Sequence, residues 1–469
     1  MLAELIVKVG GRELAVLEQE LPETAAELEE QVLNLTQRAG RELLKPGLQQ
    51  IADRTPAPCC CGRSMKNCGL REITVMTMCG EVIVQRRRYR CRCSDCHCEL
   101  HPADARLCCG THRVSKPLAK RVCQLAAVEH FTRMPELLAA QHGVTLCHET
   151  ILELAHDVGG AAERMRLAEA KSSVARRDPR QVMLRNPPKC LYVSVDGIMY
   201  CTNQTEADPD HPEQKRHSTM CNFEPRMIAG LSVVHIPFVV ASGKWQQMKV
   251  GCVYWQDEHE HWHKQMTWGR ESPEEFAASL WRLAMQCGYG QAEVKIFAAD
   301  GGAWCWDIHA RYFSDATGVL DWYHASEHVW DAAKIVSPTA PTGSSHVTSS
   351  TAWAEDALTQ LHDGGGTALI DWLRPQLATR RGHPRKAIEH LLSYVIDKQH
   401  HMNYPAAKAG RLQIGSGMIE STCKQLVGQR LKGPGMHWSE QGALAITALR
   451  ATDLNGQWNS FWNTVSIKS

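Results

Sequence analysis

The absence of three features excludes several classes of protein. No apolar run approaches the roughly 18 residues that a membrane-spanning helix needs, so we expect no membrane partner. The N-terminal stretch MLAELIVKVGGREL lacks the basic-then-apolar pattern of a secretory leader, and we therefore expect a cytoplasmic protein. The net charge is only +1, so any nucleic-acid-binding surface must come from local patches.

Cysteine, in contrast, is plentiful and unevenly distributed. Eleven of the 20 cysteines lie between Cys59 and Cys109, and clustered cysteines in a reducing compartment favour metal binding over disulfides. The stretch ITVMTMCGEVIVQRRRYRCRC has the alternation of two strands joined near Gly80. We therefore expect a cysteine-rich, zinc-ribbon-like hairpin over residues 56–112.

Four cysteines are the candidate ligands of one structural Zn²⁺ in this hairpin. Cys93 and Cys96 have the usual C-x-x-C spacing, whereas Cys59-x-Cys61 is one residue shorter. Thiolate ligands would stabilise a fold that is too small to hold itself together. Two alternatives stay open: other cysteines act as ligands, or the hairpin holds no metal. The competing cysteines are Cys91, Cys98, Cys108 and Cys109.

A run of arginines lies inside the same segment. Arg86, Arg87 and Arg88 are followed closely by Arg90 and Arg92. Arginines at this density suit contacts to phosphates, which position a protein on DNA without reading its bases. The first three are our DNA-binding candidates in this segment. The alternative is a charged strand face that is only solvated.

Residues 113–160 are expected to be helical and to contain a DNA-binding helix-turn-helix. In LLAAQHGVTLCHETILELA, Ala139 is expected where two helices touch and Gly143 where the turn needs a left-handed backbone. Ile151 would hold the second helix down. His148 and Glu149, near the start of that helix, are candidates for DNA contacts that set sequence preference. Any helical hairpin could produce the same pattern.

From Pro188 the pattern changes to strands and helices. Buried strands are expected in KCLYVSVDGIMY, RMIAGLSVVHIPFVV, QQMKVGCVYWQ, AEVKIFAADGGAW and TGVLDWYH. A helix with Ser272 as its N-cap precedes the fourth strand, and a short helix follows it. We expect the first strand to end at Asp196 and the fourth at Asp300. This order, β-β-β-α-β-α-β, predicts an α/β domain.

Acids at the carboxyl ends of neighbouring parallel strands share one crevice. Asp196 and Asp300 meet there if the first and fourth strands are neighbours. A third acid on a following helix would complete a carboxylate cage, and Glu420 lies in the first turn of a helix expected near Gly417. Such ligands suit two Mg²⁺ or Mn²⁺ ions, which promote phosphoryl transfer. Alternatively, each Asp-Gly is only a turn, and Glu420 only favours its helix dipole.

The stretch DWYHASEHVW contains H-x-x-E-H at His324, Glu327 and His328, which is the zinc spacing of the inverted metalloproteases. The match follows a buried strand of a domain whose acids already form another site. No third zinc ligand can be assigned downstream. We therefore expect His324 to line a DNA-facing crevice or to pack at the base of a helical insertion that follows, while Glu327 and His328 brace its helix.

Five stretches carry a family resemblance: VSVDG, ADGGAW, LDWYHASEH, GSGMIES and GPGMHWSEQGALAITALRA. Together they resemble the bacterial insertion-sequence transposases of the DDE group, Kra type, over nearly the whole chain. The resemblance implies a multidomain α/β protein with an RNase H-like catalytic core at 189–324 and 410–435. An α-helical insertion would occupy 325–409. The remaining segments are an N-terminal β and helical part at 1–55, a linker at 161–188 and a C-terminal helix and tail at 436–469.

By this resemblance, Asp196, Asp300 and Glu420 are the catalytic acids of a DNA transposase. It would bind the terminal inverted repeats of an insertion sequence, cleave double-stranded DNA and join the end to target DNA, acting as a homo-oligomer in the bacterial cytoplasm. Further candidates for the DNA surface are Lys424, Arg430, Lys432 and Trp438. Two rival functions remain: a zinc metallopeptidase that uses H-x-x-E-H, and a catalytically inactive DNA-binding protein descended from a transposase.

Overall fold

The computed structural model describes residues 2–9, 12–20, 23–60, 63–93, 98–175, 184–203, 244–337 and 349–465. The architecture is mixed α/β, with a mixed five-stranded sheet and many helices. The chain divides into two compact units, Met1–Arg164 with Leu444–Ser469, and Met165–Ala443. Over the described ranges, no helix combines the length and the apolar character that crossing a membrane requires.

The first unit begins with an antiparallel hairpin and a long helix. The hairpin pairs β1 (Leu2–Val9) with β2 (Arg12–Glu20). Helix α1 (Ala25–Asp53) follows, and a capping box of Thr24 and Glu27 satisfies backbone N–H groups at its start. The end of α1 packs on the cysteine-rich hairpin in an apolar core, which consists of Ala52, Ile73, Val75, Val82, Val84, Ala103 and Leu107.

The expected hairpin is present, with its turn at the expected place. Strands β5 (Lys66–Thr77) and β6 (Gly80–Arg90) pair antiparallel, and Gly80 has a φ of +102° that favours glycine. The accompanying elements are β3 (Cys59–Cys60), β4 (Arg63–Ser64), β7 (Glu99–Leu100) and α2 (Asp104–Leu107).

The proposed zinc ligands fall mostly outside the described residues. Cys61 and Cys96 are not described, and neither is the side chain of Cys59. Cys93 is described and half-buried. The structural zinc therefore stays a prediction.

Three helices occupy the region expected to contain the helix-turn-helix: α3 (Lys116–Ala126), α4 (Met134–His142) and α5 (His148–Ala175). Gly143 has the expected left-handed backbone, with a φ of +60°, and its N–H donates to the Ala139 carbonyl at 2.9 Å. The expected contact role of the Ala139 side chain is wrong, because that side chain is exposed. Leu138, about 100° away around the helix, is the buried residue, together with Ile151.

Helix α5 continues to Ala175, so the first part of the segment expected to be a connecting helix and linker belongs to the same helix. Within the first unit, Gly159 of α5 lies against the backbone of Ala445 in α15 (Glu440–Leu454), so closely that a Cβ would collide with the carbonyl. Glycine here lets the two helices approach. The last described helix is α16 (Trp458–Thr464), whose Trp458, Phe461 and Trp462 are buried.

The second unit is built on a five-stranded sheet in the order β10-β9-β8-β11-β12. β8 pairs antiparallel with β9 and parallel with β11; β10 is antiparallel to β9, and β12 is parallel to β11. The strands are β8 (Cys190–Thr202), β9 (Lys244–Gln256), β10 (Trp262–Gly269), β11 (Val294–Ala299) and β12 (Thr317–Leu320). The described order is β-β-β-α-β-α-β, and the first and fourth expected strands are neighbours, as predicted.

The sheet differs from the expected one in the strand β10 and in the length of β8. The strand expected in RMIAGLSVVHIPFVV lies outside the described residues. The strand β10 was not expected. β8 does not end at Asp196 but continues to Thr202, because β9 stays paired with it as far as Lys244.

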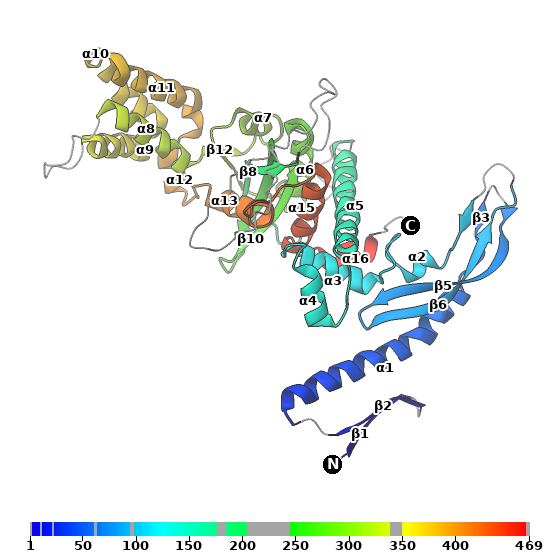
Figure 1. The fold of residues 1–469 in the computed structure, drawn as a ribbon. Helices are drawn as coiled ribbons and strands as arrows, with labels where there is room; N and C mark the ends of the chain where they lie inside the picture. Colours follow the sequence, from blue (N-terminus) through cyan, green and yellow to red (C-terminus); the bar gives the residue numbers. More distant parts are fainter. Residues whose placement is uncertain are drawn as a thin grey trace, which may run out of the picture. The chain divides into compact units, whose positions relative to one another are not determined.

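Helices surround this sheet and form a separate bundle (Figure 1). α6 (Pro273–Gln286) begins with the expected Ser272 cap, which forms a capping box with Glu275. α7 (Ala303–Tyr312) connects β11 to β12. Figure 1 shows the bundle of α8 (Trp322–Val336), α9 (Ser349–Leu373), α10 (Gln376–Thr379) and α11 (Gly382–Lys398).

The helical bundle starts earlier than expected, since α8 begins at Trp322 rather than at residue 325. After the bundle, a turn of 3-10 helix η2 (Gln399–His401) leads to α12 (Tyr404–Ala409). The buried Tyr404 hydroxyl donates to the Leu320 carbonyl at 3.1 Å, which ties α12 to β12. The chain then forms α13 (Gly417–Cys423), the π-helix η3 (Lys424–Gly428) and α14 (Gln429–Leu431).

Candidate acidic site at the strand ends

The parallel pairing between β8 and β11 ends at Val195 and Ala299, which are partners in register. Asp196 and Asp300 are the next residues of these neighbouring strands, so the two acids lie at the same level, although Asp196 stays paired with Val250 of β9. Both side chains are half-buried. The sequence prediction that these acids share one crevice is consistent with this pairing.

Each aspartate is oriented by a backbone N–H group and a buried thiol. Gly197 N–H donates to Asp196 Oδ1 at 2.6 Å, and Gly302 N–H donates to Asp300 Oδ1 at 3.0 Å. The thiols belong to Cys423, 3.6 Å from Asp196 Oδ2, and to Cys305, 3.4 Å from Asp300 Oδ1. Sequence analysis missed both cysteines, because neither belongs to a spaced cysteine motif.

Burial keeps these two thiols protonated. It raises the pKa of Cys305 far above its usual range, and the negative charge of Asp300 raises it further. The pKa of Cys423 is raised in the same way by burial and by Asp196. Both groups therefore act as neutral hydrogen-bond donors to carboxylates, not as nucleophiles.

Glu420 belongs to the same electrostatic neighbourhood. Its helix α13 packs on β8 and β9, and its side chain is exposed. The pKa of Asp196 is raised by burial, and the charges of Asp300 and Glu420 raise it further. The three carboxylates therefore repel one another, which is the situation that a divalent cation relieves.

The donor chemistry of these acids fits Mg²⁺ or Mn²⁺. All three present hard oxygen atoms, and no lysine, arginine or histidine of the described chain forms an ion pair with any of them. As the side chains stand, no group of three or more His, Cys, Asp or Glu in the described ranges is close enough to hold a metal ion. A cage of all three acids would need their carboxylates to come closer together than they are in this structure.

Asp321 is a fourth acid at this edge, and sequence analysis missed it. It follows β12 as Asp300 follows β11, and it is 4% exposed. Its two oxygens accept hydrogen bonds from the N–H groups of His324, at 2.8 Å, and Ser416, at 2.6 Å. The sequence TGVLD does show an aspartate at the end of a third strand. It does not show that this aspartate bonds to the distant Ser416.

The histidines of H-x-x-E-H do not form a zinc site within the described residues. His324 lies beside Gly301, the residue after Asp300, where a Cβ would be 2.9 Å from its Nε2 atom. His328 packs against Tyr394, with ring centroids 4.0 Å apart and ring planes tilted by 32°. Glu327 is exposed, and its Oε2 lies 4.0 Å from His324 Nδ1.

Tyr394 is another residue of the helical bundle that lies next to the loop after Asp300. It lies on α11, and its ring edge would be 3.3 Å from a Cβ at Gly301. Burial raises its pKa above the usual range, and the charges of Asp300 and Asp321 raise it further. The hydroxyl is buried and has no hydrogen-bond partner among the described residues.

Two arginines expected on a DNA surface are buried. Arg86 is 8% exposed, because strand alternation places it on the same face as Val82 and Val84, and its Nε lies 2.5 Å from Asp104 Oδ1. Arg430 is 1% exposed and lies over the ring of the buried Trp438, 4.8 Å from the centroid. Neither arginine, nor Trp438, is a surface contact in this structure.

The other DNA candidates keep accessible positions. Arg88 is half-buried, with its Nη1 3.5 Å from Glu99 Oε1, whereas Arg87 is exposed. His148 is half-buried at the start of α5. The exposed candidates are Arg87, Glu149, Lys424 and Lys432.

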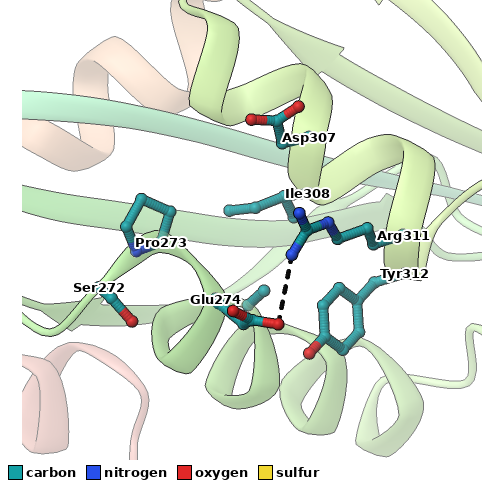
Figure 2. A pocket seen from close by; sticks show the side chains of 8 residues that line it. Ser272, Pro273, Glu274, Asp307, Ile308, Arg311 and Tyr312 are labelled. Atoms are coloured by element: carbon teal, nitrogen blue, oxygen red, sulfur yellow. Dashed lines mark hydrogen bonds and ion pairs between the residues drawn. The ribbon is translucent and has the colours of Figure 1, made fainter.

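The hollow in Figure 2 lies between α6 and α7, and none of the candidate acids lines it. Arg311 and Glu274 face each other across it, with Nη1 and Oε1 3.2 Å apart. Both side chains are largely exposed, so this pair contributes little to stability. The lining residues are Ser272, Pro273, Glu274, Ala277, Asp307, Ile308, Arg311 and Tyr312.

Comparison with models of protein families and with curated proteins gives no match for this chain. Any functional assignment therefore depends on the residues and geometry described above, together with the motif resemblance.

Proposed function

We propose that this protein is a DNA transposase with an RNase H-like catalytic core. The observation that carries the proposal is the parallel pairing of β8 with β11, which brings Asp196 and Asp300 to one edge of the sheet. Helix α13, packed on β8, adds Glu420 to that neighbourhood. The motif resemblance names the same three acids.

Two divalent cations bound by these acids would activate an attacking oxygen and stabilise the leaving one. The residues around them orient the ligands. Gly197, Gly302 and the two buried thiols fix the carboxylates of Asp196 and Asp300 by hydrogen bonds. The exposed Glu420 reaches the site from α13. His324 and Tyr394 border the acids from the side of the helical bundle.

DNA recognition is assigned to the first unit. The helices α4 and α5, with Gly143 between them, are the candidate helix-turn-helix, and Glu149 is exposed at the start of α5. Arg87 is exposed on the cysteine-rich hairpin and suits a phosphate contact. The cysteines of the same hairpin would bind a structural Zn²⁺. Terminal inverted repeats and target DNA are the proposed partners, and the protein would act on them as a homo-oligomer in the cytoplasm.

The test is end cleavage by the purified full-length protein on candidate element ends, in Mg²⁺ or Mn²⁺. Wild type should bind these ends in preference to random DNA and cut them. Asp300→Asn should bind equally well and lose cleavage by several orders of magnitude. Preferential binding without cutting by wild type would instead identify the inactive DNA-binding alternative. No preference for element ends would contradict the proposal.

A further inference from the structure

We propose that Asp321 is a positioning residue that holds the start of α13, and thereby Glu420, at the edge of the sheet where Asp196 and Asp300 lie. This inference rests on the proposed function, because the role of Glu420 there gives the positioning its purpose. The hydrogen bonds of Asp321 can be tested independently of the proposed function.

The two oxygens of Asp321 do different things. Oδ2 accepts from the His324 N–H group, which caps α8. Oδ1 accepts from the Ser416 N–H group, which belongs to the segment that begins α13. A cap alone needs one oxygen, and serine, threonine or asparagine would supply it. A buried aspartate is required only when both oxygens are used.

From Ser416 the contacts lead directly to the third acid. The Ser416 hydroxyl donates to Glu420 Oε1, and the Ser416 carbonyl accepts from the Glu420 N–H group at 3.0 Å. A second backbone bond supports the arrangement, because the Trp322 N–H group donates to the Ile414 carbonyl at 2.9 Å. Asp321 is therefore two hydrogen bonds from the Glu420 carboxylate.

These bonds join the two ends of the helical bundle. Asp321 and Trp322 lie at the start of the bundle, whereas Ile414 and Ser416 follow it, and 95 positions separate Asp321 from Ser416. Asp321 is buried, yet no lysine, arginine or histidine in the described part of the chain forms an ion pair with it. Its charge is met by backbone N–H groups, so losing one of them would be costly.

The experiment separates the cap from the link to Ser416. In Asp321→Ser, the hydroxyl can still cap α8 but is too short to reach Ser416 as well. In Ser416→Ala, the backbone bond to Asp321 remains but the hydroxyl bond to Glu420 is lost, and Ser416→Thr restores it. Ser272→Ala removes the cap of α6 in the same unit and serves as the matched control.

Two readouts are measured on the full-length proteins. Hydrogen exchange of residues 411–423 should be about 10- to 100-fold faster in Asp321→Ser than in wild type, while 322–336 keeps its protection. Mn²⁺ affinity, followed by electron paramagnetic resonance, should fall about 10- to 100-fold in Asp321→Ser and Ser416→Ala, as expected for residues that orient a metal ligand. Ser416→Thr and Ser272→Ala should behave like wild type.

The outcomes separate this inference from the function on which it rests. Unchanged exchange of 411–423 in Asp321→Ser overturns the inference, whatever the metal result. Faster exchange with unchanged Mn²⁺ affinity also overturns it, since Asp321 would then support only the local backbone. A third outcome is possible: hydrogen exchange of 411–423 becomes faster in Asp321→Ser, but Glu420→Gln does not weaken Mn²⁺ binding by the protein. In that case the link from Asp321 to α13 stands and the proposed metal-dependent function fails.

Discussion

Val195 of β8 pairs with Ala299 of β11 in parallel register, so Asp196 and Asp300, the next residues, extend from neighbouring strands at the same level. Glu420 reaches this neighbourhood from a helix that packs on β8. The three acids come from parts of the chain that are separated by a strand pair and by a helical bundle. The site therefore depends on the fold as a whole.

Glu420→Gln should lower the rates of cleavage and strand transfer by several orders of magnitude, while the protein still folds and binds element ends. Glutamine keeps the size and helix propensity of glutamate but loses the charge that balances a divalent cation. The measurement is strand transfer from pre-cut ends in Mg²⁺. Equal activity of wild type and variant would remove Glu420 from the site.

The matched control is Glu327→Gln. Glu327 is exposed on α8, 4.0 Å from His324 Nδ1, and has no assigned part in the reaction. This variant should keep far more activity than Glu420→Gln. A zinc peptidase using H-x-x-E-H would require the opposite ranking of the two variants.

Local patterns predicted the elements well where each element carries its own signal. Alternation identified β5 and β6, buried apolar runs identified β8, β9, β11 and β12, and capping chemistry placed Ser272 at the start of α6. The same rule of alternation could have shown that Arg86 shares the buried face of Val82 and Val84. The charge of the arginine run does not by itself show which of its residues lie on the buried face of the strand.

Other features could not be predicted, because they depend on contacts between distant segments. Nothing near Asp196 indicates that β9 keeps β8 paired as far as Thr202. Nothing near Asp321 indicates a bond to Ser416, and the thiols of Cys305 and Cys423 meet the acids only in the folded chain. Each of these contacts involves a partner that local periodicity does not encode.

Asp196→Asn should stabilise the metal-free protein near neutral pH. Burial and the charges of Asp300 and Glu420 raise the pKa of Asp196 in the folded state. This group therefore favours folding below its unfolded pKa of 3.8, and that contribution is lost as the pH rises through the folded pKa. Denaturant unfolding in the presence of a chelator should show a higher free energy of unfolding for the variant than for wild type at neutral pH. This difference should shrink toward pH 4.

Asp307→Asn is the control for this effect. Asp307 is exposed on α7, so its carboxylate stays hydrated and its removal should leave the free energy of unfolding within about 0.5 kcal/mol of wild type. Mg²⁺ should raise the stability of wild type and of this control but not that of Asp196→Asn. An Asp196→Asn variant that is less stable than wild type at neutral pH would contradict the prediction.

Arg87→Ala and Arg86→Ala should have different effects. Arg87 is exposed, so its loss should weaken binding to all DNA sequences and lower the salt slope by about 1, with little change in stability. Arg86 pairs with Asp104 in a largely buried position, so its loss should destabilise the protein by about 1–3 kcal/mol. Salt titrations of DNA binding and denaturant unfolding measure the two effects. Equal stability losses would contradict the assignment.

The purified, reduced protein should contain about one zinc per chain, as one four-thiolate site requires. Cys93→Ser should release the metal and weaken end binding, because the hairpin would lose the ligands that stabilise its fold. Cys147→Ser is the control, since Cys147 is exposed and lies outside the cluster. Elemental analysis decides the matter, and fresh reduced protein without zinc would exclude the site.

Tyr404→Phe should lower the stability of the protein, whereas Tyr394→Phe should not. The Tyr404 hydroxyl is buried and donates to the Leu320 carbonyl, so its loss should cost about 0.5–1.5 kcal/mol. The Tyr394 hydroxyl is buried without a hydrogen-bond partner among the described residues, so its loss should leave stability equal or higher. Under the proposed function, this unpartnered hydroxyl near Asp300 would be free to contact the reacting groups. End cleavage should therefore fall in Tyr394→Phe despite its stability, and a stability loss equal to that of Tyr404→Phe would show that Tyr394 only supports the fold.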